Sequence, residues 1–561
     1  MMELIKVNPD KCVGCNACVR VCPAPEANIT KQLEDGRFVT TVDSSKCIAC
    51  GECVKNCMHG ARDYNDDTEE VMENIRTEQH IVIAAPAIKT VFPDKWKSIL
   101  NWFKRNNCLV YDVSFGADIC TWAHLRTIQN GVGNKLISQP CAAIVKYIET
   151  YQPVLLNNLA PIHSPMLCAV TYIKKYLRKR HKIIALSPCV AKKNEFTETG
   201  LVDYNVTFKK LLEYFMNNNI NIERDSSSDF KYDFELFQGQ VGGVYPRPGG
   251  LRDNLWLHDP DINITTSEGV HKVYPELDMY AKLSENLKPE VFDVLSCDFG
   301  CNVGAGTGTT QTIFEIMATM RDVEKEAKSR RKTSGGFFRG AEDKLFKKFD
   351  EELSVDDFVR TYIHTKPAKA VTSAELEPIF KSMGKDTTEK KNYDCHACGY
   401  RSCREMAVAI YRGLNVPENC IVHAKARMAE DNKIIQQRHD FLSQVTSNCL
   451  EISNKLKSEA DRISDNIKNV DGISKTNEDF VSQLNDLISA LITVCESSED
   501  GISQGDVGQI IEILKSIKDV FSKFSKNIDM TNSNNEEVST NVTEINTLII
   551  SINDELSKVN K

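Results

Sequence analysis

The sequence predicts a multidomain protein that combines a small α+β module, a larger α/β domain, a second small cysteine-rich domain and an all-α C-terminal region. Three observations predict this order. The chain has 561 residues, enough for about four domains. Many of its 21 cysteines lie in short motifs at two places, and residues 441–561 contain no Trp, Tyr or His. We place the domains at residues 1–75, 76–370, 371–435 and 436–561.

The charge balance excludes several classes of partner. The chain has 69 basic and 78 acidic residues, a net charge of -9, so no basic excess is present to bind nucleic acid. The N-terminal segment MMELIKVNPDKC lacks an apolar signal region, and no apolar stretch approaches the roughly 20 residues of a membrane span. Because clustered cysteines indicate metal ligation in a reducing compartment, we expect a cytoplasmic protein.

Two cysteine runs near the N-terminus share the spacing C-x2-C-x2-C-x3-C. They are typical of bacterial two-cluster ferredoxins, in which three cysteines of one run and the last cysteine of the other hold each [4Fe-4S] cluster. Zinc ribbons instead use two separated cysteine pairs. The first cluster is expected on Cys12, Cys15, Cys18 and Cys57, and the second on Cys47, Cys50, Cys53 and Cys22. A ferredoxin-like α+β module that transfers electrons is therefore predicted.

The central region alternates short apolar runs with helical patterns, which predicts an α/β domain. Strands are expected within 81–87, 108–115, 182–189 and 292–297. Ligands of open α/β sheets bind beyond the carboxyl ends of strands, where cysteines from several loops can converge. The candidates are Cys141, Cys189, Cys297 and Cys301. For any one of them alone, a small buried apolar residue is the favoured interpretation.

Around these cysteines the chain resembles the FeFe hydrogenase family, over roughly residues 1 to 345. The similar segments are APAIKTVF (85–92), DVSFGADICTWA (112–123), PVLLNNLAPIHSPM (153–166) and SPCVAKKNE (187–195). The resemblance implies an H-cluster, in which a [4Fe-4S] cubane on Cys141, Cys189, Cys297 and Cys301 is bridged by Cys301 to a diiron subcluster with CO, CN and dithiolate ligands. It also implies H2 and protons as substrates, and ferredoxin or another redox protein as partner. Lys192 matches the family lysine that would hold a CN ligand.

The chain departs from catalytic members of that family around the diiron position. Pro140 replaces the cysteine that relays protons, and proline has no ionisable group. Ser187 and Leu295 replace two methionines, and Ser187 could offer a hydrogen bond to a diatomic ligand. The carboxylates after FGAD are missing, which leaves His124 as a candidate relay.

These losses resemble the sensory branches of the family and favour a hydrogen or redox sensor with low turnover. A slow catalytic hydrogenase and a non-catalytic electron-transfer or iron-sulfur assembly protein are the alternatives.

A third motif resembles the small 4Fe-4S domain of corrinoid-protein and electron-transport subunits. It consists of Cys395, Cys398, Cys403 and Cys420. Zinc is the competing occupant, because four cysteines alone do not select the metal.

The C-terminal region is expected to be a helical hairpin or coiled coil. Apolar residues recur at three- and four-residue steps from Leu514 to Ile528 and from Val542 to Val559. A glycine-containing break between Ser497 and Gly508 would let residues 437–494 pair with those that follow. Two chains could then form a four-helix bundle, or one chain could form an ordinary intramolecular bundle. The weak similarity to the cytoplasmic hairpin of methyl-accepting chemotaxis proteins suggests a signalling partner and a homodimer.

Overall fold

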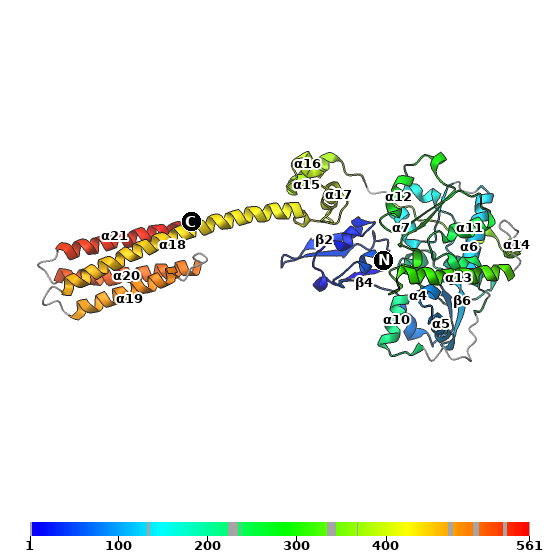
Figure 1. The fold of residues 1–561 in the computed structure, drawn as a ribbon, viewed down its shortest axis with the longest axis horizontal. Coiled ribbons are helices and arrows are strands. Elements are labelled where there is room, and N and C mark those ends of the chain that lie inside the picture. Colours follow the sequence, from blue (N-terminus) through cyan, green and yellow to red (C-terminus); the bar gives the residue numbers. More distant parts are fainter. Residues whose placement is uncertain are drawn as a thin grey trace. The chain divides into compact units, whose positions relative to one another are not determined.

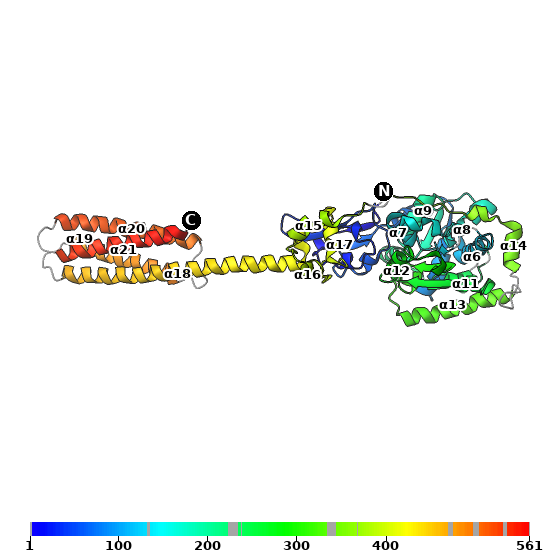
Figure 2. The same cartoon turned by 90° about the horizontal axis from the view of Figure 1, so that it is seen from above.

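The computed structural model describes residues 3–131, 135–222, 234–236, 238–333, 344–366, 369–468, 475–496, 504–530 and 536–559. The chain divides into two compact units, Met1–His423 and Ala424–Lys561. Figures 1 and 2 show the elements of both units along the chain. Each unit is described by itself below.

The N-terminal module contains two antiparallel strand pairs. Strand β1 (Ile5–Val7) pairs with β4 (Arg62–Tyr64), and β2 (Asn28–Gln32) pairs with β3 (Phe38–Val42). Two short helices, α1 (Ala17–Arg20) and α2 (Glu52–Lys55), carry the third cysteine of each run. The buried Arg62 guanidinium donates to Asn28 Oδ1 and to the Thr40 carbonyl, both at 3.0 Å, and so joins the two strand pairs. The module is the α+β fold that the cysteine spacing predicted.

The central domain contains two parallel sheets. The first has the strand order β6-β5-β8-β9, and the second has the order β10-β11-β7. The strands are β5 (His80–Ala84), β6 (Cys108–Asp112), β7 (Leu136–Ile137), β8 (Ile183–Ser187), β9 (Tyr204–Thr207), β10 (Ile264–Glu268) and β11 (Val291–Leu295). Strands β5, β8 and β11 are buried at every residue, which explains their continuous apolar runs. All four predicted strands are present.

Helices connect and cover the strands of both sheets. They are α3 (Thr68–Asn74), α4 (Ala87–Val91), α5 (Trp96–Arg105), α6 (Val113–Gln129), α7 (Ala142–Tyr151), α8 (Pro165–Thr171), α9 (Lys192–Thr199), α10 (Phe208–Asn217), α11 (Gly250–His258), α12 (Val273–Tyr280), α13 (Ile313–Thr333) and α14 (Lys344–Glu352). Helix α6 is buried over most of its length. Its Trp122 packs edge-on against Phe349 and Phe358, so the segment after residue 344 completes the core around α6.

The small domain that follows contains α15 (Ser373–Ser382), α16 (Thr388–Lys391) and α17 (Cys403–Tyr411). Thr372 caps α15 through a capping box with Glu375, and Ser402 caps α17. The buried side chains of Leu376, Phe380 and Met406 form one apolar core with the last three cysteines of the third motif. This core holds the cysteine loop although the domain is small.

The second unit is a bundle of four helices from one chain (Figures 1 and 2). The helices are α18 (Ile421–Lys468), α19 (Lys475–Glu496), α20 (Gln504–Met530) and α21 (Glu536–Val559). Leu514, Ile517 and Phe521 of α20 are buried in its core, as their spacing predicted, and so are Ile545, Ile549, Ile552 and Leu556 of α21. The segment 437–494, which was expected to pair with the residues after Gly508, contains the part of α18 up to Lys468 and most of α19 from Lys475.

The expected glycine turn also differs from the structure. Residues 497–503 lie outside the described residues, whereas Gly505 and Gly508 belong to α20. The apolar stripes of α20 and α21 therefore pack against helices of the same chain, as in the intramolecular alternative. Among the described residues, no helix has both the length and the apolar character that a bilayer-spanning segment needs.

We expect Leu514→Ala to weaken the bundle by about 2–5 kcal/mol, because it leaves a cavity at a fully buried position. Hydrogen exchange of the full chain, followed by mass spectrometry of α20 peptides, should show faster exchange. Ile550→Ala is the matched control, since Ile550 on α21 is 60% exposed and its loss should leave exchange nearly unchanged. Equal exchange in both variants would contradict the assigned core.

Candidate metal centres

The central domain contains a cavity of about 100 Å³ where the carboxyl ends of both sheets meet. Its wall includes Ala85 after β5, Val113 after β6, Pro188 after β8 and Ser296 after β11. Pro140 enters from the loop that follows β7. Parallel strands point their carboxyl ends to one edge, so five loops that are distant in sequence reach one place.

All four cysteines expected in this domain line that cavity: Cys141, Cys189, Cys297 and Cys301. Burial raises the pKa of Cys189 to about 11, with a further contribution from Cys141, and burial also raises the pKa values of Cys297 and Cys301. Thiolates gathered around one cavity repel one another unless positive charge compensates them. A cluster of iron ions supplies that charge, so this donor set fits a [4Fe-4S] group.

The Lys192 ammonium group lies at the cavity wall and is held by the buried carboxylate of Glu195. Lys192 Nζ lies 3.0 Å from Ser164 Oγ and 2.5 Å from Glu195 Oε2. The other oxygen of Glu195 accepts from Arg360 Nη1 at 2.7 Å. Burial opposes ionisation of Glu195, but Lys192 and Arg360 outweigh it and hold the pKa of Glu195 below its ordinary value. Arg360 Nη2 also lies 3.5 Å from Glu198 Oε2, so Arg360 has a second carboxylate partner, whereas the ammonium group of Lys192 lies at the cavity wall.

The rest of the cavity wall is mostly apolar. Besides the cysteine thiols, the side chains of Lys192, Tyr245 and Ser296 are its polar members among the described residues, and Pro140, Met166 and Leu295 are apolar. Pro140 directly precedes Cys141 and has no group that can carry a proton. The cavity can therefore bind a small ligand beside the cysteines but offers few groups for general acid-base chemistry.

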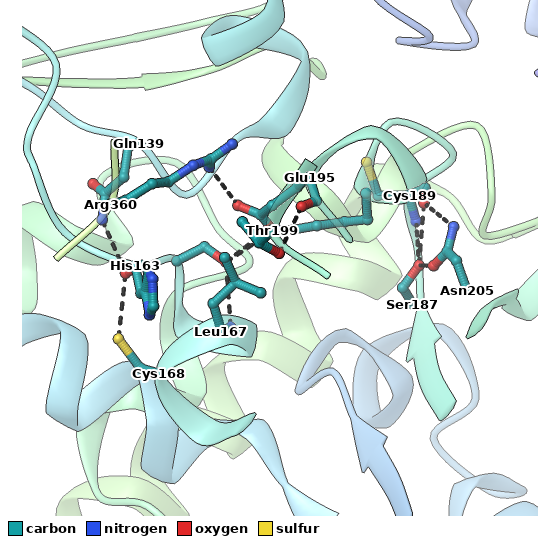
Figure 3. A network of polar contacts seen from close by, with 12 residues as sticks. Gln139, His163, Leu167, Cys168, Ser187, Cys189, Glu195, Thr199, Asn205 and Arg360 are labelled. Carbon is teal, nitrogen blue, oxygen red and sulfur yellow. Dashed lines mark hydrogen bonds and ion pairs between the residues drawn. The ribbon is translucent and has the colours of Figure 1, made fainter. Parts of the chain in front are cut away.

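Ser187 lies behind the cavity wall and organises the loop of Cys189 (Figure 3). Its hydroxyl lies 2.6 Å from Asn205 Oδ1, and it accepts a hydrogen bond from the Cys189 backbone N–H at 3.3 Å. Asn205 Nδ2 in turn donates to the Cys189 carbonyl at 3.1 Å. Ser187 is not among the residues that line the cavity. Its partners give it a positioning role that the sequence did not indicate.

His124 lies in a separate buried cluster with Cys120 and Cys168 and does not line the cavity. Its Nδ1 lies 2.8 Å from the Cys120 carbonyl oxygen and 3.7 Å from Cys120 Sγ. Burial alone would raise the pKa of Cys120, but Cys168 and His124 outweigh this effect and lower it to about 5. Tyr245 links the two sites, because it lines the cavity and also contacts Cys120.

Figure 3 also shows how this cluster is joined to the residue before Pro140. The His163 carbonyl accepts from Gln139 Nε2 at 3.1 Å and from Cys168 Sγ at 3.3 Å. Gln139 Nε2 is also 3.7 Å from Cys120 Sγ. The cluster therefore supports the backbone of the loop that carries Pro140 and Cys141.

The N-terminal cysteines form two sets. The first set lines a cavity of about 20 Å³ and consists of Cys12, Cys15, Cys18 and Cys57. In the second set, burial raises the pKa of Cys47 to about 11, and the neighbouring thiols raise one another's pKa values. Its members are Cys22, Cys47, Cys50 and Cys53. Each set takes three cysteines from one run and one from the other, as the ferredoxin resemblance implies.

The small domain brings its four cysteines around a cavity of about 10 Å³. They are Cys395, Cys398, Cys403 and Cys420. Cys395 is exposed, whereas the other three are buried. Burial raises the pKa values of Cys398 and Cys403, so this site also needs a positive occupant to ionise its thiols.

Three family models match the chain. Residues 78–305 match the iron only hydrogenase large subunit, C-terminal domain. Residues 11–61 match a 4Fe-4S dicluster domain, and residues 392–422 match the domain described as "Putative Fe-S cluster". No curated protein sequence matches the chain.

Several solved structures are similar over 54% of this chain and 100% of their own. They include the apo [FeFe]-hydrogenase HydA1 of Chlamydomonas reinhardtii as a variant, with 13% identity and a TM-score of 0.40. Another variant of the same enzyme has 14% identity and a TM-score of 0.39. HydA(deltaEFG), from a study of stepwise H-cluster assembly, has 14% identity and a TM-score of 0.40.

The chain is thus an FeFe hydrogenase-like iron-sulfur protein, with a ferredoxin-like module before the hydrogenase domain and a further Fe-S domain after it. Sequence reasoning missed Glu195, Arg360 and Tyr245 as residues of the site. Glu195 follows Lys192 by three residues in the helix of SPCVAKKNE, a spacing that could have indicated their ion pair. Arg360 carries no local signal.

Glu195→Gln should destabilise the central domain by about 3–5 kcal/mol, because it leaves two buried cations without their shared carboxylate. The lowered pKa of Glu195 adds stability above its unfolded pKa of 4.5, and that stability is lost as the pH falls through the lower folded value. Chemical denaturation of the holoprotein from pH 7 down to about pH 3 measures both effects. Glu389→Gln is the control, since Glu389 is exposed on α16. Equal unfolding midpoints for the two variants would exclude a structural role for the Glu195 charge.

Proposed function

We propose that the chain is a hydrogen or redox sensor that binds H2 at an H-cluster and has low turnover. The observation that carries this proposal is the composition of one cavity. Its wall combines four thiols and the Lys192 ammonium, which suit the cofactor, with Pro140 at the position of the family's proton-relay cysteine. The cavity has the groups that would hold a redox cofactor, but it has few side chains that can donate or accept a proton.

The proposed cofactors are two ferredoxin-type [4Fe-4S] clusters, the H-cluster and one C-terminal [4Fe-4S] cluster. In the central cavity Cys141, Cys189, Cys297 and Cys301 would hold the cubane, and Cys301 would also bridge to the diiron subcluster. When bound, the H-cluster supplies the site at which H2 is split or formed. Lys192 would donate a charge-assisted hydrogen bond to a cyanide ligand, and Glu195 with Ser164 keeps that ammonium in place.

The signal would pass to the C-terminal helices. Helix α18 begins at Ile421, the residue after the cluster cysteine Cys420, so a change of charge at that cluster acts beside the helix start. Further along α18, Met428 and Ile435 are 64% and 62% exposed and seven residues apart. This spacing suits a coiled-coil contact, and we propose a homodimer or a cytoplasmic signalling partner there.

The second candidate is a slow hydrogenase that exchanges electrons with ferredoxin. The contact from Tyr245 at the cavity wall to Cys120, and from Cys120 to His124, favours this candidate because these groups can carry protons. A non-catalytic electron-transfer or assembly protein is a third possibility. That role does not require Lys192 at the cavity wall, where the ammonium group lies beside the cysteines.

Infrared spectroscopy of anaerobically matured protein tests the sensor. We expect bands of metal-bound CO and CN under argon that shift under H2, while H2 turnover stays far below the roughly 10³ per second of a fast enzyme. Turnover at that rate would contradict the sensor and favour the hydrogenase. Absence of the bands after competent maturation would remove the diiron group and leave electron transfer or assembly.

Pro140→Cys tests the reason given for the low turnover. A thiol at the cavity wall supplies a transferable proton, so we expect H2 formation with a reduced viologen to rise about 10²-fold or more. Pro140→Ala is the matched control, since it removes the ring without adding an acid, and its rate should stay near that of the native protein. If both variants gave the same rate at equal iron content, missing proton transfer would not be what limits this site.

A further inference from the structure

The face of the ferredoxin-like module that carries its first cysteine set is covered by the small C-terminal domain. Both lie within the unit Met1–His423. The buried Val19 belongs to the same apolar core as Cys398, Cys403 and Cys420, and Cys18 packs against that core. Two cysteine motifs almost 400 residues apart in sequence therefore share one core.

The two backbones approach closely at Gly399, the residue after Cys398. Gly399 has φ +93°, and a Cβ there would lie 2.8 Å from Val19 Cβ and 3.0 Å from the Arg20 backbone nitrogen. No side chain larger than hydrogen fits without displacing one of the two segments. The ligand loop of the C-terminal site thus lies directly on helix α1, which carries Cys18.

Two asparagines that adjoin cluster cysteines form a reciprocal amide pair across this face. Asn16 Nδ2 donates to Asn419 Oδ1 at 2.8 Å, and Asn419 Nδ2 donates to Asn16 Oδ1 at 3.2 Å. Asn16 follows Cys15, and Asn419 precedes Cys420. The pair gives a contiguous polar connection from one cysteine set to the other.

Contacts at the edge of the face hold the two domains in register. The Thr30 N–H donates to the Leu414 carbonyl at 2.9 Å, which extends β2 toward the small domain. Arg412 forms an ion pair with Glu26, and its Nη2 donates to the Lys369 carbonyl at 3.0 Å. Glu26 and Arg412 do not belong to either cysteine set, so they can be changed without removing a ligand.

The other end of the ferredoxin-like module contacts the hydrogenase cavity. A Cβ on Gly51, which follows Cys50, would lie 2.3 Å from the Cβ of Ala305, in the segment that follows the cavity cysteine Cys301. Burial raises the pKa of the Tyr274 hydroxyl, and Cys50 and the cavity residues Cys141 and Cys297 all lie near enough to raise it further. The second cysteine set therefore adjoins the cavity, and the first set adjoins the small domain.

We propose that the C-terminal cluster is the electron-transfer neighbour of the first ferredoxin-type cluster, so that the small domain occupies this face in place of a diffusing redox partner. The inference rests on the proposed filling of these sites with [4Fe-4S] groups, but not on whether the chain senses or turns over H2. In each transfer the first cluster loses one electron and the C-terminal cluster gains it. H2 bound in the cavity, which releases two electrons and two protons, is the physiological reductant in this scheme.

The test is electron paramagnetic resonance of the full holoprotein reduced with dithionite, a reductant that does not require the H-cluster. We expect a magnetic interaction, seen as signal broadening and faster relaxation, that is absent in Cys403→Ala. Arg412→Glu should weaken the interaction by placing two carboxylates together. The double variant Glu26→Arg with Arg412→Glu should restore it, because the ion pair forms again with reversed partners.

Three outcomes would overturn the inference: zinc instead of iron at the C-terminal site by metal analysis, the same spectrum for the native protein and Cys403→Ala, or an unchanged interaction in Arg412→Glu. If Cys403→Ala failed to fold, the comparison of Arg412→Glu with the double variant would still decide. Infrared spectra of the same samples report the H-cluster separately. Loss of H2-dependent bands with an intact magnetic interaction would refute the proposed function alone, and the reverse result would refute this inference alone.

Discussion

The arrangement of the central site depends on one buried carboxylate. Glu195 accepts from Lys192 and Ser164 through one oxygen and from Arg360 through the other, so it fixes helix α9, the loop before α8 and a segment after α14 together. A charge at this depth is tolerable only because both oxygens have charged or hydrogen-bonded partners. The position of the Lys192 ammonium group at the cavity wall thus follows from contacts that stabilise the fold as well as from function.

Much of this architecture could be predicted from the sequence because it follows from local patterns. Continuous apolar runs predicted strands β5, β6, β8 and β11, and the placement of cysteines after strands predicted that they converge. The tail was harder, since heptad spacing identifies a buried stripe but not the chain that covers it. The stripes of α20 and α21 are buried within one chain, a result that depends on four helices packing at once.

The residues that sequence reasoning missed act through distant contacts. Arg360 reaches Glu195 across 165 positions, and Tyr245 reaches Thr121 across 124, so no motif near either residue indicates the contact. Ser187 shows the opposite error. Its position in a family motif suggested a pocket residue, whereas its hydroxyl is used by Asn205 and the Cys189 loop. Position in a motif gives the element that carries a side chain, but packing decides which way the side chain faces.

With the proposed clusters in place, the central cavity would be reached more easily by electrons than by protons. The cysteine sets form a series from the central cavity, through the ferredoxin-like module, to the small domain. The backbones of neighbouring domains approach closely along this series, at Gly51 and at Gly399. For protons, the cavity wall offers only Lys192, Tyr245 and Ser296 besides the cysteines among the described residues, Pro140 precedes Cys141, and the cluster of His124 and Cys120 lies behind Tyr245. An enzyme needs both exchanges at equal rates, because each H2 releases as many protons as electrons. In a sensor, the redox state of the site must influence another part of the protein. A slow proton step lengthens the lifetime of that redox state and so favours this use.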